Sequence, residues 1–185
     1  MNDNHLLGPL QHLVGQWEGK GGTDTAPSAD RGVRVSSYRE RLSFVPTGRV
    51  DNHEQVLYGL RYSTTTWRLN EPDPYHEELG YWMWDAANGI VLRSFVIPRG
   101  IALLAGGKAT ADASSFHLEA ELGSATWGIA SNPFLHEHFR TVRYTLEVKV
   151  LSPTQFSYEE DTVLQMKGRA DLFHHTDTHA LTKVG

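Results

Sequence analysis

The chain has 185 residues and a net charge of -5, with 39% hydrophobic and 21% charged residues. This length and composition predict one globular domain over residues 1–185 with a sizeable core. The negative charge argues against nucleic acid as a partner, because phosphate binding needs a basic face. The absence of cysteine excludes disulfides and thiolate chemistry.

The N-terminal residues predict a short helical turn. Leu6, Leu10 and Val14 follow approximate helical spacing, and Pro9 limits the segment to a turn or two because proline is tolerated only in a first turn. The start has neither the basic residues nor the long apolar core of a signal peptide. No apolar run approaches the roughly 18 residues of a membrane helix, so we expect a cytoplasmic protein without a membrane partner.

A glycine-rich strand is predicted next, with the sequence GQWEGKG at residues 15–21. It lacks the lysine-serine ending of a phosphate loop. Glycines permit the sharp coiling of a strand at a barrel corner, and Trp17 would be a large buried side chain there. Residues 22–32 contain turn-forming residues such as Pro27 and Ser28, and we interpret them as a polar loop.

The rest of the chain predicts a succession of strands separated by turns. Residues 46–52 and 70–74 carry turn signals, and residues 123–138 are less regular, indicating a loop or short helical turn. With the glycine-rich segment, the expected strands are residues 33–44, 53–67, 76–84, 90–97, 101–107, 115–122, 139–151, 156–166 and 173–184.

About ten strands at hairpin spacing with almost no helix predict an all-β fold. The expected architecture is an antiparallel up-and-down β-barrel of the lipocalin or fatty-acid-binding-protein type, with a short N-terminal helical turn. Such a barrel can enclose a ligand cavity. The structural alternative is a β-sandwich.

The last predicted strand, residues 173–184, contains three histidines. Because side chains alternate along a strand, His175, Asp177 and His179 share one face and His174 lies on the other. An inward-pointing histidine in a strand that closes a barrel is a way to hold a haem iron. The alternative is an edge strand with solvated histidines, and a slip of one residue in register would exchange the two faces.

Other combinations of possible ligand or catalytic residues give weaker support for a functional site. Adjacent His76, Glu77 and Glu78 cannot all converge on one ion from a strand. His136 and His138 would share a face of a strand, but a zinc site needs a third ligand. No Gly-x-Ser-x-Gly motif supports a hydrolase triad, and no dinucleotide-binding glycine motif is present.

Several stretches together resemble the nitrobindin family of haem-binding β-barrels. GQWEGKG matches the GxWxGxG signature of that family. Further similar stretches occur in the same order along the chain: the Leu-Gly-Pro-Leu lead-in, SSYRERLSF at 36–44, TTW at 65–67, HEELGYW at 76–82, VIPRG at 96–100 and the final Lys183-Val184.

The resemblance implies a ten-stranded barrel that carries ferric haem, binds nitric oxide and isomerises peroxynitrite to nitrate. By resemblance the axial ligand of a haem b iron is His175, and the candidate cofactor-binding residues are His175, His179, Ser28 and Trp17. Ser28 stands nearest to the position of a family threonine close to the haem. The loop that contains it, TAPSADRG, lacks the usual Tyr-Pro-Thr, and the tail reads His-Thr-Asp-Thr instead of His-Leu-x-Ala. Whether the protein is an enzyme is therefore left open.

A haem-free carrier of a fatty acid or another apolar molecule is the alternative function. It needs a charged or hydroxylated group inside the barrel to bind a carboxylate, for which Arg39, Arg61, Arg143 and Tyr144 are candidates. A third hypothesis is a barrel with a filled interior that acts as an interaction module. We expect a monomer or a homodimer in each case.

Overall fold

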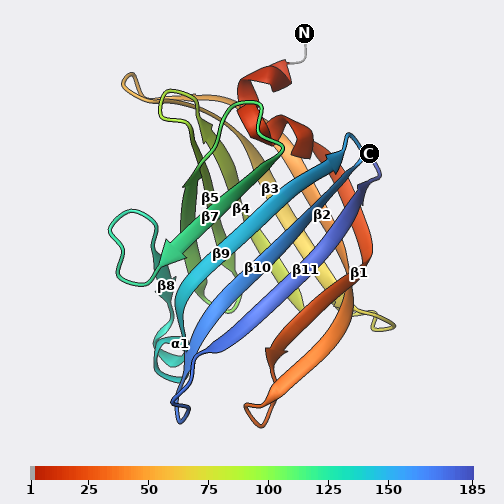
Figure 1. The fold of residues 1–185 in the computed structure, drawn as a ribbon, viewed down its shortest axis with the longest axis vertical. Helices are drawn as coiled ribbons and strands as arrows, with labels where there is room; N and C mark the ends of the chain where they lie inside the picture. The colour runs from red at the N-terminus through yellow and green to blue at the C-terminus, as the bar shows by residue number, and fades with distance from the viewer. Residues whose placement is uncertain (1–2) are drawn as a thin grey trace.

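The structure is a computed structural model that describes residues 3–185, and it is dominated by one antiparallel sheet closed into a barrel (Figure 1). The helical segments are a 3-10 helix η1 (Asp3–Leu13) and α1 (Pro133–His138). The strands are β1 (Gly15–Pro27), β2 (Val33–Asp51), β3 (Val56–Arg68), β4 (His76–Asp85), β5 (Ile90–Ile97), β6 (Ile101–Lys108), β7 (Ser115–Glu121), β8 (Ile129–Ser131), β9 (Phe139–Ser152), β10 (Gln155–Met166) and β11 (Phe173–Lys183).

Ten strands, all except the short β8, close the barrel. Each of them pairs with the next of the ten along the chain, so β7 pairs with β9. The first strand pairs with the last, β1 with β11, and β5 pairs with both β4 and β6. The junction of β6 with β7 is reduced to the pair Gly106 and Glu119, and the three-residue β8 pairs with the start of β6. This topology confirms the expected ten-stranded up-and-down barrel.

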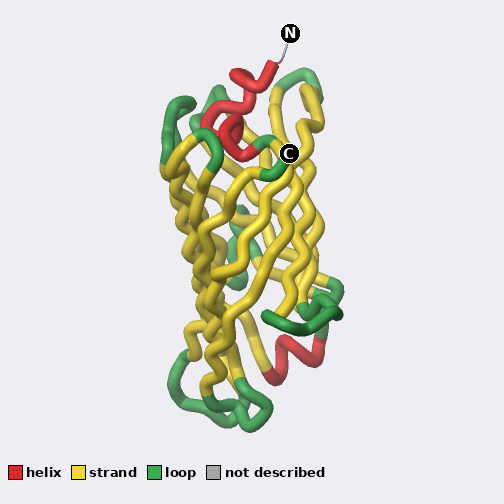
Figure 2. Tube along the Cα trace, turned by 90° about the vertical axis from the view of Figure 1, so that its right-hand side faces the viewer, coloured by secondary structure: helices red, strands yellow, loops and turns green. Residues whose placement is uncertain are grey.

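The η1 segment covers one end of the barrel, as Figures 1 and 2 show. Leu7, Leu10 and Leu13 are buried in the main core cluster. The helix kinks at Gly8, which has a φ of 55°, and a Cβ there would lie 2.5 Å from the Trp84 ring. The expected N-terminal helical turn is therefore confirmed, and its apolar face closes this end.

The opposite end carries α1 and the loop between β1 and β2 (Figures 1 and 2). Asn132 caps α1 by accepting a 3.0 Å hydrogen bond from the backbone N–H of Leu135. This helix lies in residues 123–138, where a loop or short helical turn was expected. Within residues 3–185, no helix has the length and apolar character needed to cross a membrane.

Two predicted boundaries are wrong. Residues 22–27, expected in a loop, continue β1 because all of them pair with β2 and residues 23–25 pair also with β11. Residues 46–51, expected in a turn, continue β2 past a bulge between Pro46 and Gly48. Proline and glycine are tolerated at such a bulge, where the ladder is already interrupted, and the turn lies at residues 52–55 instead.

Candidate functional site

A cavity of about 760 Å³ lies inside the barrel. Its lining includes Ser28, Arg99 and Leu135, from segments at the end opposite η1, and reaches inward to Phe44 and Trp82 of the aromatic core. This volume falls within the usual range for a small-molecule pocket. The barrel is therefore not filled by its own side chains.

The first group of polar residues in the cavity surrounds Arg93, and we call it the Arg93 network. Arg93 donates from Nη2 to Glu78 Oε2 at 2.6 Å and from Nη1 to Glu160 Oε2 at 2.9 Å. Tyr62 donates its hydroxyl to Glu78 Oε2 at 2.8 Å. Tyr144 donates to Glu160 Oε2 at 2.6 Å and accepts from Arg93. Both terminal nitrogens of the guanidinium thus donate to carboxylates and phenols, whereas the buried Nε has no hydrogen-bond partner within residues 3–185.

Titration of the Arg93 network reflects one guanidinium shared by two carboxylates. Burial raises the pKa of Glu160 to about 7, against the lowering effect of Arg93. Burial also disfavours charge on Glu78, but Arg93 and His76 lower its pKa to about 2. His76 Nε2 lies 3.2 Å from Glu78 Oε1. Burial acts to lower the pKa of His76, but the bond to Glu78 raises it to about 9.

The second polar group surrounds Glu40 and contains His179. His179 Nδ1 lies 2.9 Å from Glu40 Oε2, and the backbone N–H of Gly21 donates to His179 Nε2 at 3.4 Å. Tyr158 donates to Glu40 Oε2 at 2.9 Å and Thr64 to Oε1 at 2.6 Å. Both ring nitrogens are used if the proton is on Nδ1, and the side chain is 1% exposed. His179 therefore links β11 to β1 and β2 in the wall of the barrel.

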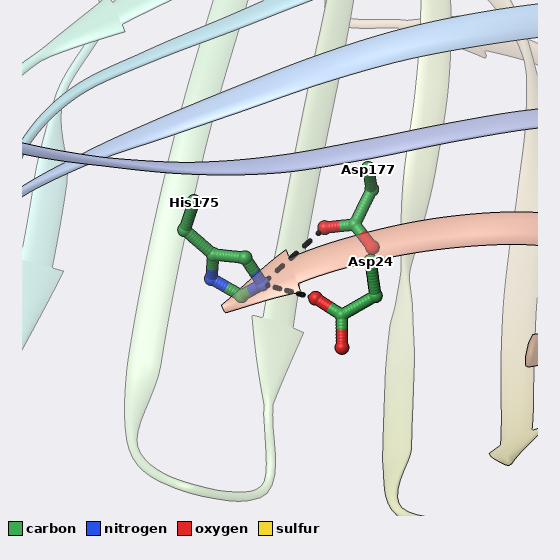
Figure 3. A group of neighbouring side chains, drawn as sticks. All are labelled: Asp24, His175 and Asp177. Carbon is green, nitrogen blue, oxygen red and sulfur yellow. Dashed lines mark hydrogen bonds and ion pairs between the residues drawn. The ribbon is translucent and has the colours of Figure 1, made fainter. Parts of the chain in front are cut away.

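The third group is the Asp24–His175–Asp177 cluster, shown in Figure 3. His175 Nε2 lies 3.0 Å from Asp24 Oδ1 and 3.4 Å from Asp177 Oδ2. Asp24 and Asp177 are directly opposite each other in the β1–β11 ladder, and His175 precedes Asp177 by two residues on the same face. All three side chains line the cavity, so the closing strands bring them together.

Burial and charge shift two pKa values in this cluster. Burial raises the pKa of Asp177 to about 7, with further increases from Glu160 and Asp24 and an opposing effect of His175. Burial acts to lower the pKa of His175, but its bond to Asp24 and the charge of Asp177 raise it overall. The cavity thus stabilises positive charge at this position.

The four residues proposed from the sequence as cofactor contacts fall in different places. His175 lies in the cavity wall, and Ser28 lies at its rim, where its hydroxyl donates to Asp30. Trp17 is 1% exposed, packs edge-to-face on Phe156 with ring centroids 4.8 Å apart, and is not among the described residues that line the cavity. His179 is bound to Glu40, as described above. The geometry therefore brings only His175 and Ser28 to the same cavity.

The other candidate residues are likewise separated. His174 is on the outer face, with Nδ1 2.7 Å from Asp161 Oδ2. Arg61 and Arg143 are exposed, and Arg39 stacks on Trp67 outside the cavity, whereas Tyr144 lines it. The histidines of the segment 136–138 lie on α1, not on a strand, so the reason for expecting them on one face was wrong.

Four inward-facing residues were not predicted from the sequence: Asp24, Glu40, Arg93 and Glu160. Arg93 lies two residues from the buried Val91 and from the buried Phe95, and it shares their inward face of β5. A charged residue at an inward position of the strand was therefore the available signal. Asp24 was hidden by the loop assignment of residues 22–32.

Comparison with known proteins identifies the family of this barrel. A model of the THAP4-like, haem-binding β-barrel domain matches residues 6–183. The chain belongs to this family. The match confirms the resemblance to nitrobindins, and it covers nearly the whole chain.

A solved structure supports the same fold. The crystal structure of Rv2717c from M. tuberculosis superposes with a TM-score of 0.70 at 20% sequence identity, covering 96% of this chain and 98% of that chain. No curated protein matches the sequence.

Membership of a haem-binding family raises the question of whether a haem fits this cavity. The volume and the inward-pointing His175 agree with such a ligand. The surroundings of His175 do not, because Nε2, the usual site of iron binding, faces the carboxylates of Asp24 and Asp177. An axial histidine must direct a free lone pair at the iron. The residues in this arrangement therefore do not fit a haem ligated through Nε2.

Proposed function

We propose that this member of the haem-binding barrel family binds a small organic molecule whose polar end carries positive charge or hydrogen-bond donors. The observation that supports this proposal is the carboxylate-rich lining of the cavity. Five carboxylates that are not exposed line it: Asp24, Glu40, Glu78, Glu160 and Asp177. Where these carboxylates are ionised, they repel an anionic ligand and attract a cationic one.

Three positively charged or protonatable groups of the lining are already bonded to its carboxylates: Arg93, His76 and His175. Arg93 is 6% exposed and already binds Glu78 and Glu160. Arg99 is exposed, and Arg68 is half-buried over the ring of Tyr75. A fatty-acid carboxylate that entered the cavity would therefore meet several acidic groups, and the most deeply buried guanidinium, that of Arg93, is already bound to two of them.

Apolar residues at the end of the cavity opposite η1 suit the apolar part of such a molecule. This part of the lining includes Ile97, Ile101, Leu135, Phe139 and Leu164. Ligand pockets commonly combine apolar walls with a few polar groups that fix orientation. An amphipathic molecule with its polar end directed inward would satisfy both parts of the cavity.

Three ligands with the same tail and different head groups test this proposal. Dodecylamine, dodecanol and dodecanoate would compete with the neutral fluorescent probe N-phenyl-1-naphthylamine near neutral pH. We expect the amine to bind more tightly than the carboxylate by about tenfold or more, which corresponds to roughly 1.4 kcal/mol. Equal affinities, or a preference for dodecanoate, would overturn the proposal.

Matched charge variants connect that preference to the cavity. Asp177→Asn removes an inward carboxylate and should narrow the difference between amine and carboxylate. Asp161→Asn removes a carboxylate that binds His174 on the outer face and should leave the difference unchanged. An equal effect of both variants would indicate a general charge effect.

Haem binding through His175, followed by reaction with nitric oxide or peroxynitrite, is a second candidate function. The family match favours it, and it requires His175 to exchange its two carboxylate partners for iron. A haemin titration monitored by visible absorption tests it in wild type, His175→Ala and His174→Ala. A one-to-one spectral change abolished only by His175→Ala would support this function. No change, or one indifferent to His175, would refute it.

A further inference from the structure

We propose that Asp24, His175 and Asp177 bind a divalent transition-metal ion, such as Zn²⁺ or Mn²⁺, directly and without a porphyrin. The inference goes beyond the proposed function, because the ion would bind with no organic ligand present. It rests on the arrangement of three side chains from the two strands that close the barrel.

The separations between the ligand atoms suit one shared ion. Metal bonds of about 2.1 Å place neighbouring ligand atoms about 3.0 Å apart in an octahedron and about 3.4 Å apart in a tetrahedron. His175 Nε2 lies 3.0 Å from Asp24 Oδ1 and 3.4 Å from Asp177 Oδ2. One ligand atom from each residue lies within 4.8 Å of the other two. An ion can therefore be bound with small side-chain adjustments.

The charges of the cluster also suit a dication. Asp24 is 3% exposed, and Asp177 projects into the same cavity. Buried carboxylates need a compensating cation, and a single imidazole cannot neutralise two of them. Arg93 is engaged by Glu78 and Glu160. A divalent ion would balance Asp24 and Asp177 while His175 binds as a neutral ligand.

A supporting hydrogen bond orients one of the carboxylates. Ser36 donates its hydroxyl to Asp24 Oδ2 at 3.3 Å, which leaves Oδ1 directed at His175. Bonds of this kind fix a metal ligand in position. Asp24 is thus held with one oxygen on β2 and the other facing the cavity.

The types of ligand limit the ion. Imidazole suits transition metals, and carboxylates also accept Mn²⁺ and Zn²⁺, whereas Mg²⁺ and Ca²⁺ prefer oxygen ligands alone. Three protein ligands exclude a porphyrin on the same metal, because its four nitrogens would raise the total beyond six. They leave open positions for water or for a molecule bound in the cavity.

Isothermal titration calorimetry on the full-length, chelator-treated protein tests the proposal with ZnCl₂ and MnCl₂ as probes. We expect one ion per chain. His175→Ala, Asp24→Asn and Asp177→Asn should each weaken binding by about 10- to 100-fold or more. His174→Ala is the matched control, because it removes a neighbouring histidine that binds an aspartate on the outer face, and its affinity should be unchanged.

A second measurement on the wild type does not depend on whether a variant folds. Mn²⁺ added to ¹⁵N-labelled protein should broaden the amide resonances of residues 24 and 175–177 first. The proposal would be overturned if neither Zn²⁺ nor Mn²⁺ bound, or if the broadening were centred elsewhere. It would also be overturned if His174→Ala lost as much affinity as His175→Ala. The amine and carboxylate competition is run with chelator present, so failure of either proposal is read separately.

Discussion

At the scale of single residues, the glycine-rich motif in β1 makes room for aromatic and imidazole rings. A Cβ at Gly19 would lie 2.3 Å from His179 Nε2 and 3.0 Å from the backbone carbonyl oxygen of Ala180. A Cβ at Gly22 would lie 2.4 Å from the ring of Tyr38. These glycines lie at the ends of the β1–β2 register shift, so the wall can pack directly on His179 and Tyr38.

Gly19→Ala should therefore destabilise the protein. Overpacking a filled site costs about 1–3 kcal/mol, and here the new methyl group meets a ring that is fixed by Glu40. Urea unfolding would measure the change in the free energy of unfolding. Gly21→Ala is the matched control, because nothing lies within 4 Å of a Cβ at that position. Equal stabilities of the two variants would contradict this account of the motif.

At the scale of elements, η1 acts as an apolar plug at the closed end. Leu10 and Leu13 are fully buried, and the indole N–H of Trp17 in β1 donates to the carbonyl oxygen of Leu13 at 2.7 Å. The segment is too short and irregular to be stable as an isolated helix. Its conformation depends on packing against the barrel.

Leu10→Ala tests the contribution of this plug. The substitution should lower the free energy of unfolding by about 2–5 kcal/mol, because it leaves a cavity in the core. His5→Ala, at an exposed position of the same segment, should change stability by less than about 0.5 kcal/mol. Thermal or urea unfolding of both variants gives the comparison. A small effect of Leu10→Ala would mean that the plug is not coupled to the barrel.

At the scale of the whole molecule, the interior carboxylates make stability depend on pH. The pKa of Glu160 is raised from 4.5 to about 7, and that of Asp177 from 3.8 to about 7. The pKa of His76 is raised from 6.5 to about 9. In each case the folded state binds the proton more tightly than the unfolded state. Their stabilising contributions are therefore complete at low pH and are lost as pH rises through these windows.

Thermal unfolding should show this dependence as a melting temperature that falls between about pH 5 and pH 9. Below about pH 4.5 the direction should reverse, because the pKa of Glu78 is lowered to about 2 and its contribution is lost as pH falls. Glu160→Gln should flatten the decline between about pH 5 and pH 7. A melting temperature that rose steadily toward pH 8 would contradict the charge arrangement described here.

The barrel could be predicted from the sequence, because alternating strands at hairpin spacing leave few other ways to bury their apolar faces. It also predicted that Trp17 is buried and that His175, Asp177 and His179 share a face, since these follow from local periodicity. Which histidine reaches the cavity, and what surrounds it there, depends instead on how the strands pair in the folded barrel. Asp24 and His175 are 151 residues apart, and they meet because β1 pairs with β11. No local pattern specifies a contact that forms only when the two ends of the sheet close.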